Sequence, residues 1–161
     1  MKKVVITGST RGIGRGLARE FLKRGCQVVI SGRSQEAVDT AVAELAAEYG
    51  QDKLLGVACE ITDSAQLQNL WDRAAQTFGG VDVWINNAGM SIARDHLAYA
   101  DPAALEQLVA TNLTGLLLAN RVALRGMREQ GAGQIWNMEG FGSGNQKQPA
   151  MCPYGDTKRA E

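Results

Sequence analysis

Short runs of apolar, mostly β-branched residues alternate along this chain with longer segments of helical spacing, and this alternation constrains the fold more than any other feature. The sequence predicts strands at 4–7, 28–30, 54–59, 81–85 and 134–138, helices at 14–24, 34–49, 64–78 and 101–129, and a last helix that begins near Pro153. Continuous apolar strands separated by helices are typical of a parallel sheet covered on both faces. We therefore expect an α/β, doubly wound parallel sheet whose ligand site lies at the carboxyl ends of its strands.

Residues with helix-ending properties support these boundaries. Ser34 and Asp101 stand where a helix N-cap is expected, and Asp63 suits that role as well as any other, while Glu60 suits a solvated loop. Gly25 and Gly50 follow the first two predicted helices, at the position where a chain often needs a positive φ.

Composition narrows the class of protein. The 161 residues suit one domain, here taken as residues 1–161, and 45% of them are hydrophobic, which is enough for a full core. The 17 basic and 17 acidic side chains give no sign of nucleic-acid binding, and no apolar run approaches the roughly 20 residues of a membrane span. The three cysteines lack C-x-x-C spacing, so we expect no metal site and a reducing, cytoplasmic setting.

A glycine-rich turn, Thr7 to Gly14, joins the first predicted strand to the first helix. Its residues Gly8, Ser9, Thr10, Arg11, Gly12, Ile13 and Gly14 could bring backbone N–H groups and a helix amino terminus to a phosphate. The spacing is G-x-x-x-G-x-G, which is neither the usual dinucleotide motif nor the Walker motif. An ordinary tight connection is the alternative interpretation.

The end of the second strand carries hydroxyls and a guanidinium where an enzyme using NAD usually has a carboxylate for the ribose. These residues are Ser31, Arg33 and Ser34. Arg33 and Arg11 together could neutralise a 2′-phosphate, for which the planar donor fork of arginine is suited. The alternative is two solvated surface arginines, but their place at the expected ligand edge favours NADP(H).

Three more groups follow later strands at the same sheet edge. Glu60 and Ile61 come after the third strand, and Asn86, Asn87, Ala88 and Gly89 come after the fourth. Tyr154 and Lys158 follow the fifth strand and are spaced to share one face of a helix. A phenol is a weak acid at neutral pH, and a neighbouring cation stabilises its charged form.

Together these residues resemble the short-chain dehydrogenase/reductase family over the whole chain. The family's T-G-x-x-x-G-x-G is matched by Thr7 to Gly14, its N-N-A-G by Asn86 to Gly89, its mid-helix asparagine by Asn112, and its Y-x-x-x-K by Tyr154 and Lys158. The resemblance implies a Rossmann fold. A narrower likeness to the chlorophyll b reductase branch rests on the run from Trp84 to Gly89 and on the stretch from Asn137 to Gly144.

The resemblance also implies a reaction. Tyr154 would donate a proton to a small-molecule carbonyl while NADPH supplies hydride, Lys158 would assist the tyrosine and hold the nicotinamide ribose, and Asn112 would support a proton-relay water. The implied cofactor-binding residues are the glycine turn from Gly8 to Gly14, Ser31, Arg33, Ser34, Glu60, Ile61, Asn87, Ala88, Gly89, Tyr154 and Lys158. A homo-oligomer, dimer or tetramer, is implied as well.

The chain departs from the family pattern in two places. The family's usual Ser-Ser pair aligns with Glu139 and Gly140, which leaves Ser143 as the nearest hydroxyl for the catalytic role. The chain also ends soon after Lys158, where family members continue with further strands, so the resemblance implies a domain that lacks its C-terminal part. Two alternatives to a carbonyl reductase therefore stay open: a non-catalytic NADP(H)-binding or regulatory protein, and an NAD-linked dehydrogenase that oxidises alcohols.

Overall fold

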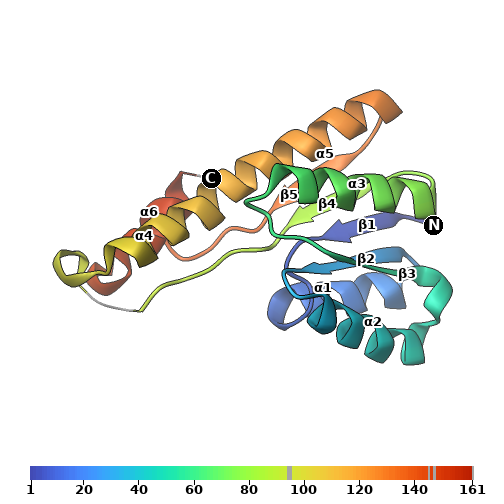
Figure 1. The fold of residues 1–161 in the computed structure, drawn as a ribbon, viewed down its shortest axis with the longest axis horizontal. Helices are drawn as coiled ribbons and strands as arrows, with labels where there is room; N and C mark the ends of the chain where they lie inside the picture. Colours follow the sequence, from blue (N-terminus) through green and yellow to red (C-terminus); the bar gives the residue numbers. More distant parts are fainter. Residues whose placement is uncertain (94–95, 145, 147, 161) are drawn as a thin grey trace.

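A computed structural model describes residues 1–93, 96–144, 146 and 148–160 of the chain. It contains a five-stranded parallel sheet in the order β3-β2-β1-β4-β5 (Figure 1). The strands are β1 Lys3–Ile6, β2 Gln27–Gly32, β3 Leu54–Ala58, β4 Val83–Asn86 and β5 Gln134–Asn137. Val5 of the central strand pairs with Val29 on one side and Trp84 on the other. The predicted doubly wound fold is thereby confirmed, and its winding reverses between β1 and β4.

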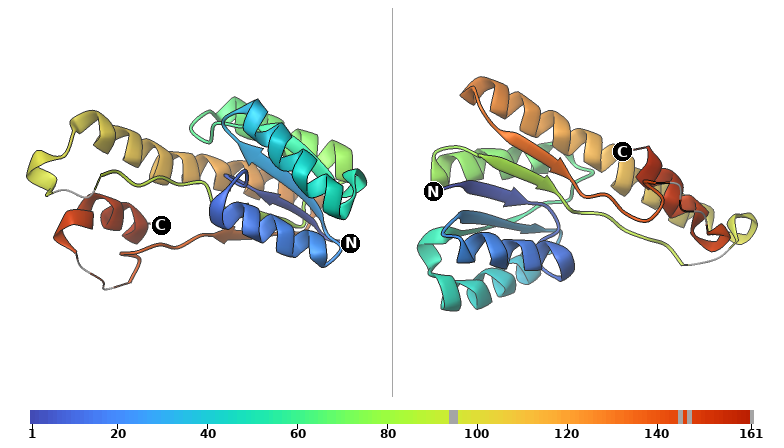
Figure 2. Two further views of the ribbon diagram at one scale, coloured as in Figure 1. Left: turned by 90° about the horizontal axis from the view of Figure 1, so that it is seen from below. Right: turned by 180° about the vertical axis from the view of Figure 1, so that it is seen from behind.

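Helices cover both faces of the sheet (Figure 2). Helices α1 (Gly12–Lys23) and α2 (Gln35–Tyr49) pack on one face, and α3 (Ser64–Phe78) and α5 (Leu116–Gln130) pack on the other. Helices α4 (Pro102–Val109) and α6 (Cys152–Arg159) lie beyond the carboxyl ends of the strands and contact each other. Single turns of 3-10 helix, which the sequence did not predict, occur at η1 Gln51–Lys53, η2 Leu97–Tyr99 and η4 Pro149–Met151.

The predicted helix caps are present. The Ser34 hydroxyl accepts the amide of Ala37 at 3.3 Å, and the Asp101 carboxylate accepts the amide of Ala103 at the same distance. Asp63 caps α3 by accepting the amides of Ala65 and Gln66 at 2.8 and 3.1 Å. The hydrogen bonds from Gln66 and then Ala65 hold the pKa of the Asp63 carboxyl below its ordinary value.

The long helix predicted over 101–129 is not uniform. Between α4 and α5 the chain forms a π-helical segment, η3 Ala110–Gly115, and only then resumes the α-helix. The wider turn directs Asn112 into the interior, where it is 2% exposed. It also brings Gly115 against Ile61, so close that a Cβ would lie 2.9 Å from the Ile61 side chain. The prediction of one regular helix was wrong here because Asn112 bonds to Met90 and Thr157 from inside the wider turn, and helical spacing does not report such tertiary partners.

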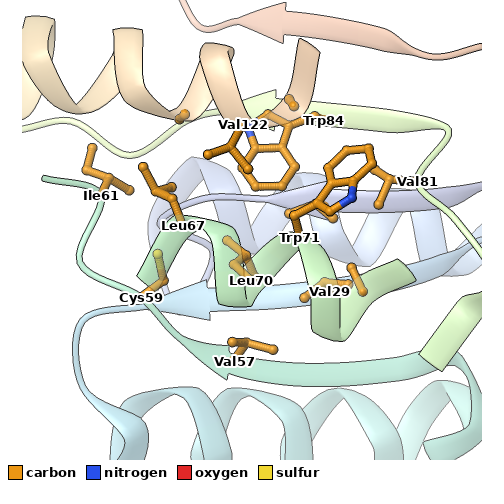
Figure 3. Close-up of a cluster of buried hydrophobic side chains, with 14 of the residues drawn as sticks. Val29, Val57, Cys59, Ile61, Leu67, Leu70, Trp71, Val81, Trp84 and Val122 are labelled. Carbon is orange, nitrogen blue, oxygen red and sulfur yellow. The ribbon is translucent and has the colours of Figure 1, made fainter. Parts of the chain in front are cut away.

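The core has one cluster on each face of the sheet. The cluster under α3 and α5 is built around Trp71 and Trp84, whose ring centroids lie 6.0 Å apart at 31° (Figure 3). Helix α5 crosses Trp71 at Gly126, where a side chain would overlap the indole ring. Trp84 is fully buried, so it serves packing rather than ligand contact. None of the helices in the described ranges is both long and apolar enough to pass through a bilayer.

Candidate active site

A cleft of about 750 Å³ opens at the carboxyl ends of the strands, where the winding reverses. It receives residues from the turns after β1, β2, β3 and β4, and most of the predicted cofactor-binding residues line it. These are Gly8, Thr10, Arg11, Gly12, Ile13, Gly14, Arg33, Ser34, Glu60, Ile61, Asn87, Ala88 and Gly89. Sequence reasoning missed further lining residues, namely Gly32, Ala37, Cys59, Met90, Gln107 and Thr111.

The glycines of the turn after β1 have distinct reasons to be glycine. Gly8 has φ +63°, and a Cβ there would lie 2.9 Å from the Cα of Ala88. Gly14 lies so close to the Asn87 amide that a Cβ would overlap it. Gly12 has φ +60°, and a Cβ built on it meets nothing within 4 Å, because it faces the open cleft. Two glycines therefore let the turn lie against the loop after β4, and the third leaves room for a ligand.

Thr7 and Asn87 fasten the glycine turn to the loop after β4. The buried Thr7 hydroxyl accepts the amides of Asn87 and Ala88 at 3.1 and 3.0 Å. The Asn87 side-chain amide donates to the carbonyls of Thr7 and Gly8, both at 2.9 Å. Asn87 thus contributes to the cleft as a brace for the turn.

The amino end of α1 presents unpaired donors to the cleft. Its N-cap, Arg11, makes no side-chain capping bond, and the first turn contains no acidic residue. The N–H groups of the first turn have no intrahelical partner, so this end favours an anion such as a phosphate. The side chains of Arg11 and Arg33 are exposed, line the same cleft, and make no hydrogen bond or ion pair within the described part of the chain.

Two predicted cofactor ligands lie inside the protein instead of lining the cleft. Ser9 is fully buried, and its hydroxyl donates to the Ile6 carbonyl at 2.7 Å and accepts the amide of Ser31 at 2.9 Å. Ser31 is 1% exposed, and its hydroxyl has no partner among the described residues. The structure therefore assigns the Ser9 hydroxyl to joining β1 with β2.

The end of β3 forms the far wall of the cleft. Cys59, Glu60 and Ile61 line it, and the Glu60 carboxylate accepts the amide of Thr62 at 3.4 Å. Burial, with smaller contributions from the charges of Glu60 and Asp63, raises the pKa of the Cys59 thiol to about 12. Cys59 is thus a protonated, packed side chain and not a nucleophile.

Tyr154 and Lys158 lie on α6, as the sequence predicts, and both face Gly140 in the loop after β5. A Cβ at Gly140 would overlap the Tyr154 hydroxyl and would lie 3.2 Å from the Cδ and Cε atoms of Lys158. The Lys158 ammonium donates to the Met138 carbonyl at 3.1 Å. The backbone of this loop therefore reaches the tyrosine hydroxyl directly, at the position where the family pattern has a serine.

Ser143, the predicted replacement for that serine, has another partner. Its hydroxyl donates to the Glu139 carboxylate at 3.4 Å, and its amide donates to the Gly140 carbonyl at 3.1 Å. These bonds turn the loop back on itself beside the Tyr154 helix. The catalytic role of Ser143 stays a prediction.

Asn112 bonds to Met90 from inside the π segment. Its Oδ1 accepts the Met90 amide at 2.9 Å, and its Nδ2 donates to the Met90 carbonyl at 3.0 Å. Gln107 and Thr111, from the same helical region, line the cleft beside Met90. The α4–η3 segment thus forms one wall of the cleft, which strand-end reasoning did not anticipate.

The donor set fits a dinucleotide with an extra phosphate. The cleft volume, the open amino end of α1, the uncrowded Gly12 and the two arginines all suit a long anionic ligand. Among the described residues, no group of three or more His, Cys, Asp or Glu side chains is placed to hold a metal ion.

Comparison with known proteins agrees with this geometry. A family model described as short chain dehydrogenase matches residues 2–161. The chain is 40% identical over 159 residues to chlorophyll(ide) b reductase NOL, chloroplastic, of Oryza sativa subsp. japonica. The matched region covers 98% of this chain and 46% of that protein. The corresponding NOL protein of Arabidopsis thaliana is 42% identical, over 98% of this chain and 45% of its own length.

Solved structures share the fold, and some of them contain NADP or NADPH. The structure described as ElxO with NADP bound superimposes with a TM-score of 0.90 at 30% identity, over 99% of this chain and 64% of that one. The chain thus spans about half the length of the reductases it matches and just under two thirds of this solved neighbour.

Proposed function

Because this chain belongs to the short-chain dehydrogenase/reductase family, we propose that the protein containing it reduces a carbonyl group to an alcohol with NADPH. One observation supports the proposal most: the Tyr154–Lys158 pair of α6 and the arginine-lined cleft both lie at the carboxyl edge of the sheet (Figure 1). Gly140 contacts Tyr154 and Lys158, while Arg11 and Arg33 line the cleft after β1 and β2. Solved relatives with NADP bound support the cofactor assignment.

The proposed chemistry divides between cofactor and protein. When bound, NADPH supplies the hydride. The Tyr154 hydroxyl donates the proton that the reduced oxygen needs, and the Lys158 ammonium stabilises the phenolate left behind. Arg11, Arg33 and the amino end of α1 bind and orient the phosphates, and a fixed orientation of this kind accounts for much of an enzyme's rate.

The proposed substrate is a formyl group on a chlorin-like ring. Relatives about 40% identical carry the name chlorophyll(ide) b reductase, and the run from Trp84 to Gly89 resembles that branch. Because Gly140 has no side chain, the loop backbone lies against the Tyr154 hydroxyl at the position where the family pattern has a serine. The same absence also motivates a second candidate, an NADP(H)-binding protein without catalysis, because the family's serine hydroxyl is missing.

The test uses the complete protein that contains this chain. Purified protein is mixed with NADPH and a formyl-bearing chlorin, and NADPH oxidation and alcohol formation are followed together. We expect turnover that Tyr154→Phe abolishes, with NADPH affinity kept within about threefold. NADPH binding without turnover would favour the second candidate, and a Tyr154→Phe protein with the wild-type rate would refute the mechanism.

Cofactor preference is tested at Arg33. The Arg33 guanidinium is exposed, so its charge-assisted hydrogen bond to the 2′-phosphate should contribute a binding free energy at the low end of the range for such bonds. Arg33→Ala should therefore weaken NADP binding about tenfold, which corresponds to about 1.4 kcal/mol. NAD binding should not change. Arg24→Ala is the matched control, because Arg24 is exposed at the other end of α1 and its loss changes the net charge equally. Equal loss of NAD and NADP binding would count against the assignment.

A further inference from the structure

The hydroxyl of Thr157 joins the catalytic helix to the wall of the cleft. Thr157 lies between Tyr154 and Lys158 on α6 and is 3% exposed. Its hydroxyl accepts a hydrogen bond from the Asn112 side-chain amide at 3.1 Å and donates one to the Tyr154 carbonyl at 2.8 Å. One buried hydroxyl therefore donates a hydrogen bond to the backbone of Tyr154 and accepts another from Asn112 of the π segment.

Asn112 carries this connection on to the cleft. Its carboxamide also bonds to the amide and the carbonyl of Met90, which lines the cleft. Both Nδ2 hydrogens and the Oδ1 atom are thus in use, so the amide has a single orientation that satisfies all its partners. Met90, Asn112, Thr157 and Tyr154 form a continuous chain of hydrogen bonds from the cofactor cleft to the proton donor.

Thr157 is the buried anchor of helix α6, which is also held by hydrogen bonds from Lys158 to the Met138 carbonyl and from Arg159 to the Gly144 carbonyl. The helix is eight residues long, it has no side-chain N-cap, and Thr157 is its one buried residue, all eight of its residues being described. A helix this short gains little stability from its own hydrogen bonds, so tertiary contacts must set its position. Removing the Thr157 hydroxyl would also leave a buried Asn112 N–H without its acceptor.

We propose that Thr157 is a positioning residue, whose hydroxyl fixes the Tyr154–Lys158 pair relative to the cofactor cleft. The expected effect on turnover rests on the proposed function, whereas the expected effect on the position of α6 rests on the hydrogen bonds alone. A displacement of about 1 Å at a reacting group can cost about a hundredfold in rate, so a loosened α6 should act on turnover and leave cofactor binding nearly unchanged.

The experiment compares Thr157→Val, which keeps the shape and loses the hydroxyl, with Thr157→Ser, which keeps the hydroxyl, in the complete protein. Thr157→Val should lower kcat about 10- to 100-fold with the KM for NADPH within about threefold, and Thr157→Ser should retain most of the rate. Thr114→Val is the matched control, since Thr114 is exposed on the same π segment and should leave kcat unchanged.

A second readout separates this inference from the proposed function. Hydrogen exchange of the peptide covering residues 152–159 should be faster in Thr157→Val than in wild type, with exchange in β1 and β4 unchanged. If wild type binds NADPH but turns over no carbonyl substrate, the proposed function fails while the exchange difference still tests the role of Thr157. Unchanged α6 exchange, or equal losses in kcat, NADPH affinity and sheet protection, would overturn the inference.

Discussion

Replacing Gly126 with alanine should destabilise this domain, although alanine is the better helix former. Gly126 lies inside α5, where the substitution alone would add about 1 kcal/mol of stability. A methyl group there would overlap Cε2 and Cζ2 of Trp71, which is 7% exposed and packs at a tilt against the fully buried Trp84. Overpacking by one methyl group costs about 1–3 kcal/mol, and the rigid indole pair puts this site at the upper end.

The net loss is then about 2 kcal/mol, which for a chain of this size lowers Tm by about 4–8 °C. The matched control is Gly16→Ala in α1, where a Cβ meets nothing within 4 Å and the same substitution should raise Tm by about 2 °C. Thermal unfolding followed by circular dichroism and tryptophan fluorescence measures both variants. A Gly126→Ala protein that melts at or above the wild-type temperature would refute the packing argument.

Three further perturbations test the site and its surroundings. Gly140→Ser restores the family residue, but its Cβ would overlap the Tyr154 hydroxyl. We therefore expect kcat to fall by at least about tenfold without a loss of NADPH binding. A gain in kcat would show that the loop simply lacks the serine. Burial raises the pKa of the Cys59 thiol to about 12, so the stability that this group contributes is full below the ordinary thiol pKa and is lost as pH rises toward 12. A plot of Tm against pH should therefore be flatter for Cys59→Ala than for wild type in this range. Parallel curves for the two proteins would contradict this expectation. The capping bonds lower the pKa of the Asp63 carboxyl, so the stability that it contributes is present above the ordinary carboxyl pKa and is lost as pH falls. Asp63→Asn keeps a capping side chain, and its Tm should depend less on pH in acid. Melting curves at acidic pH measure this difference.

Local chemistry in the sequence was sufficient for the fold. Short, largely apolar runs marked the strands, and Ser34, Asp63 and Asp101 accept the amides that an N-cap should accept. The alternation of strands and helices then left few topologies, because parallel crossovers have a fixed hand. The π segment escaped prediction because its cause is tertiary: Asn112 must reach Met90 and Thr157, and hydrophobic spacing does not register such partners.

The candidate site was predicted by residue type more successfully than by orientation. Arg11 and Arg33 line the cleft, whereas the Ser9 hydroxyl from the same turn points into the protein, and nothing in the local sequence distinguishes these cases. Gln107 and Thr111 reach the cleft from a helix far along the chain, so only the folded arrangement identifies them. The homo-oligomer and the cytoplasmic setting remain predictions.

Because the helices that cover the two faces of the sheet come from different parts of the chain, the two faces close at different times during synthesis. The described buried residues on the α1 and α2 side come from the first 54 residues, apart from Val83 and Ile85. The opposite cluster draws on α5 as far as Met127, so Trp71 and Trp84 have no cover until that helix has left the ribosome. A nascent chain paused after β4 would present this tryptophan pair to chaperones, and the pair is the part of the domain whose burial depends most on continued translation.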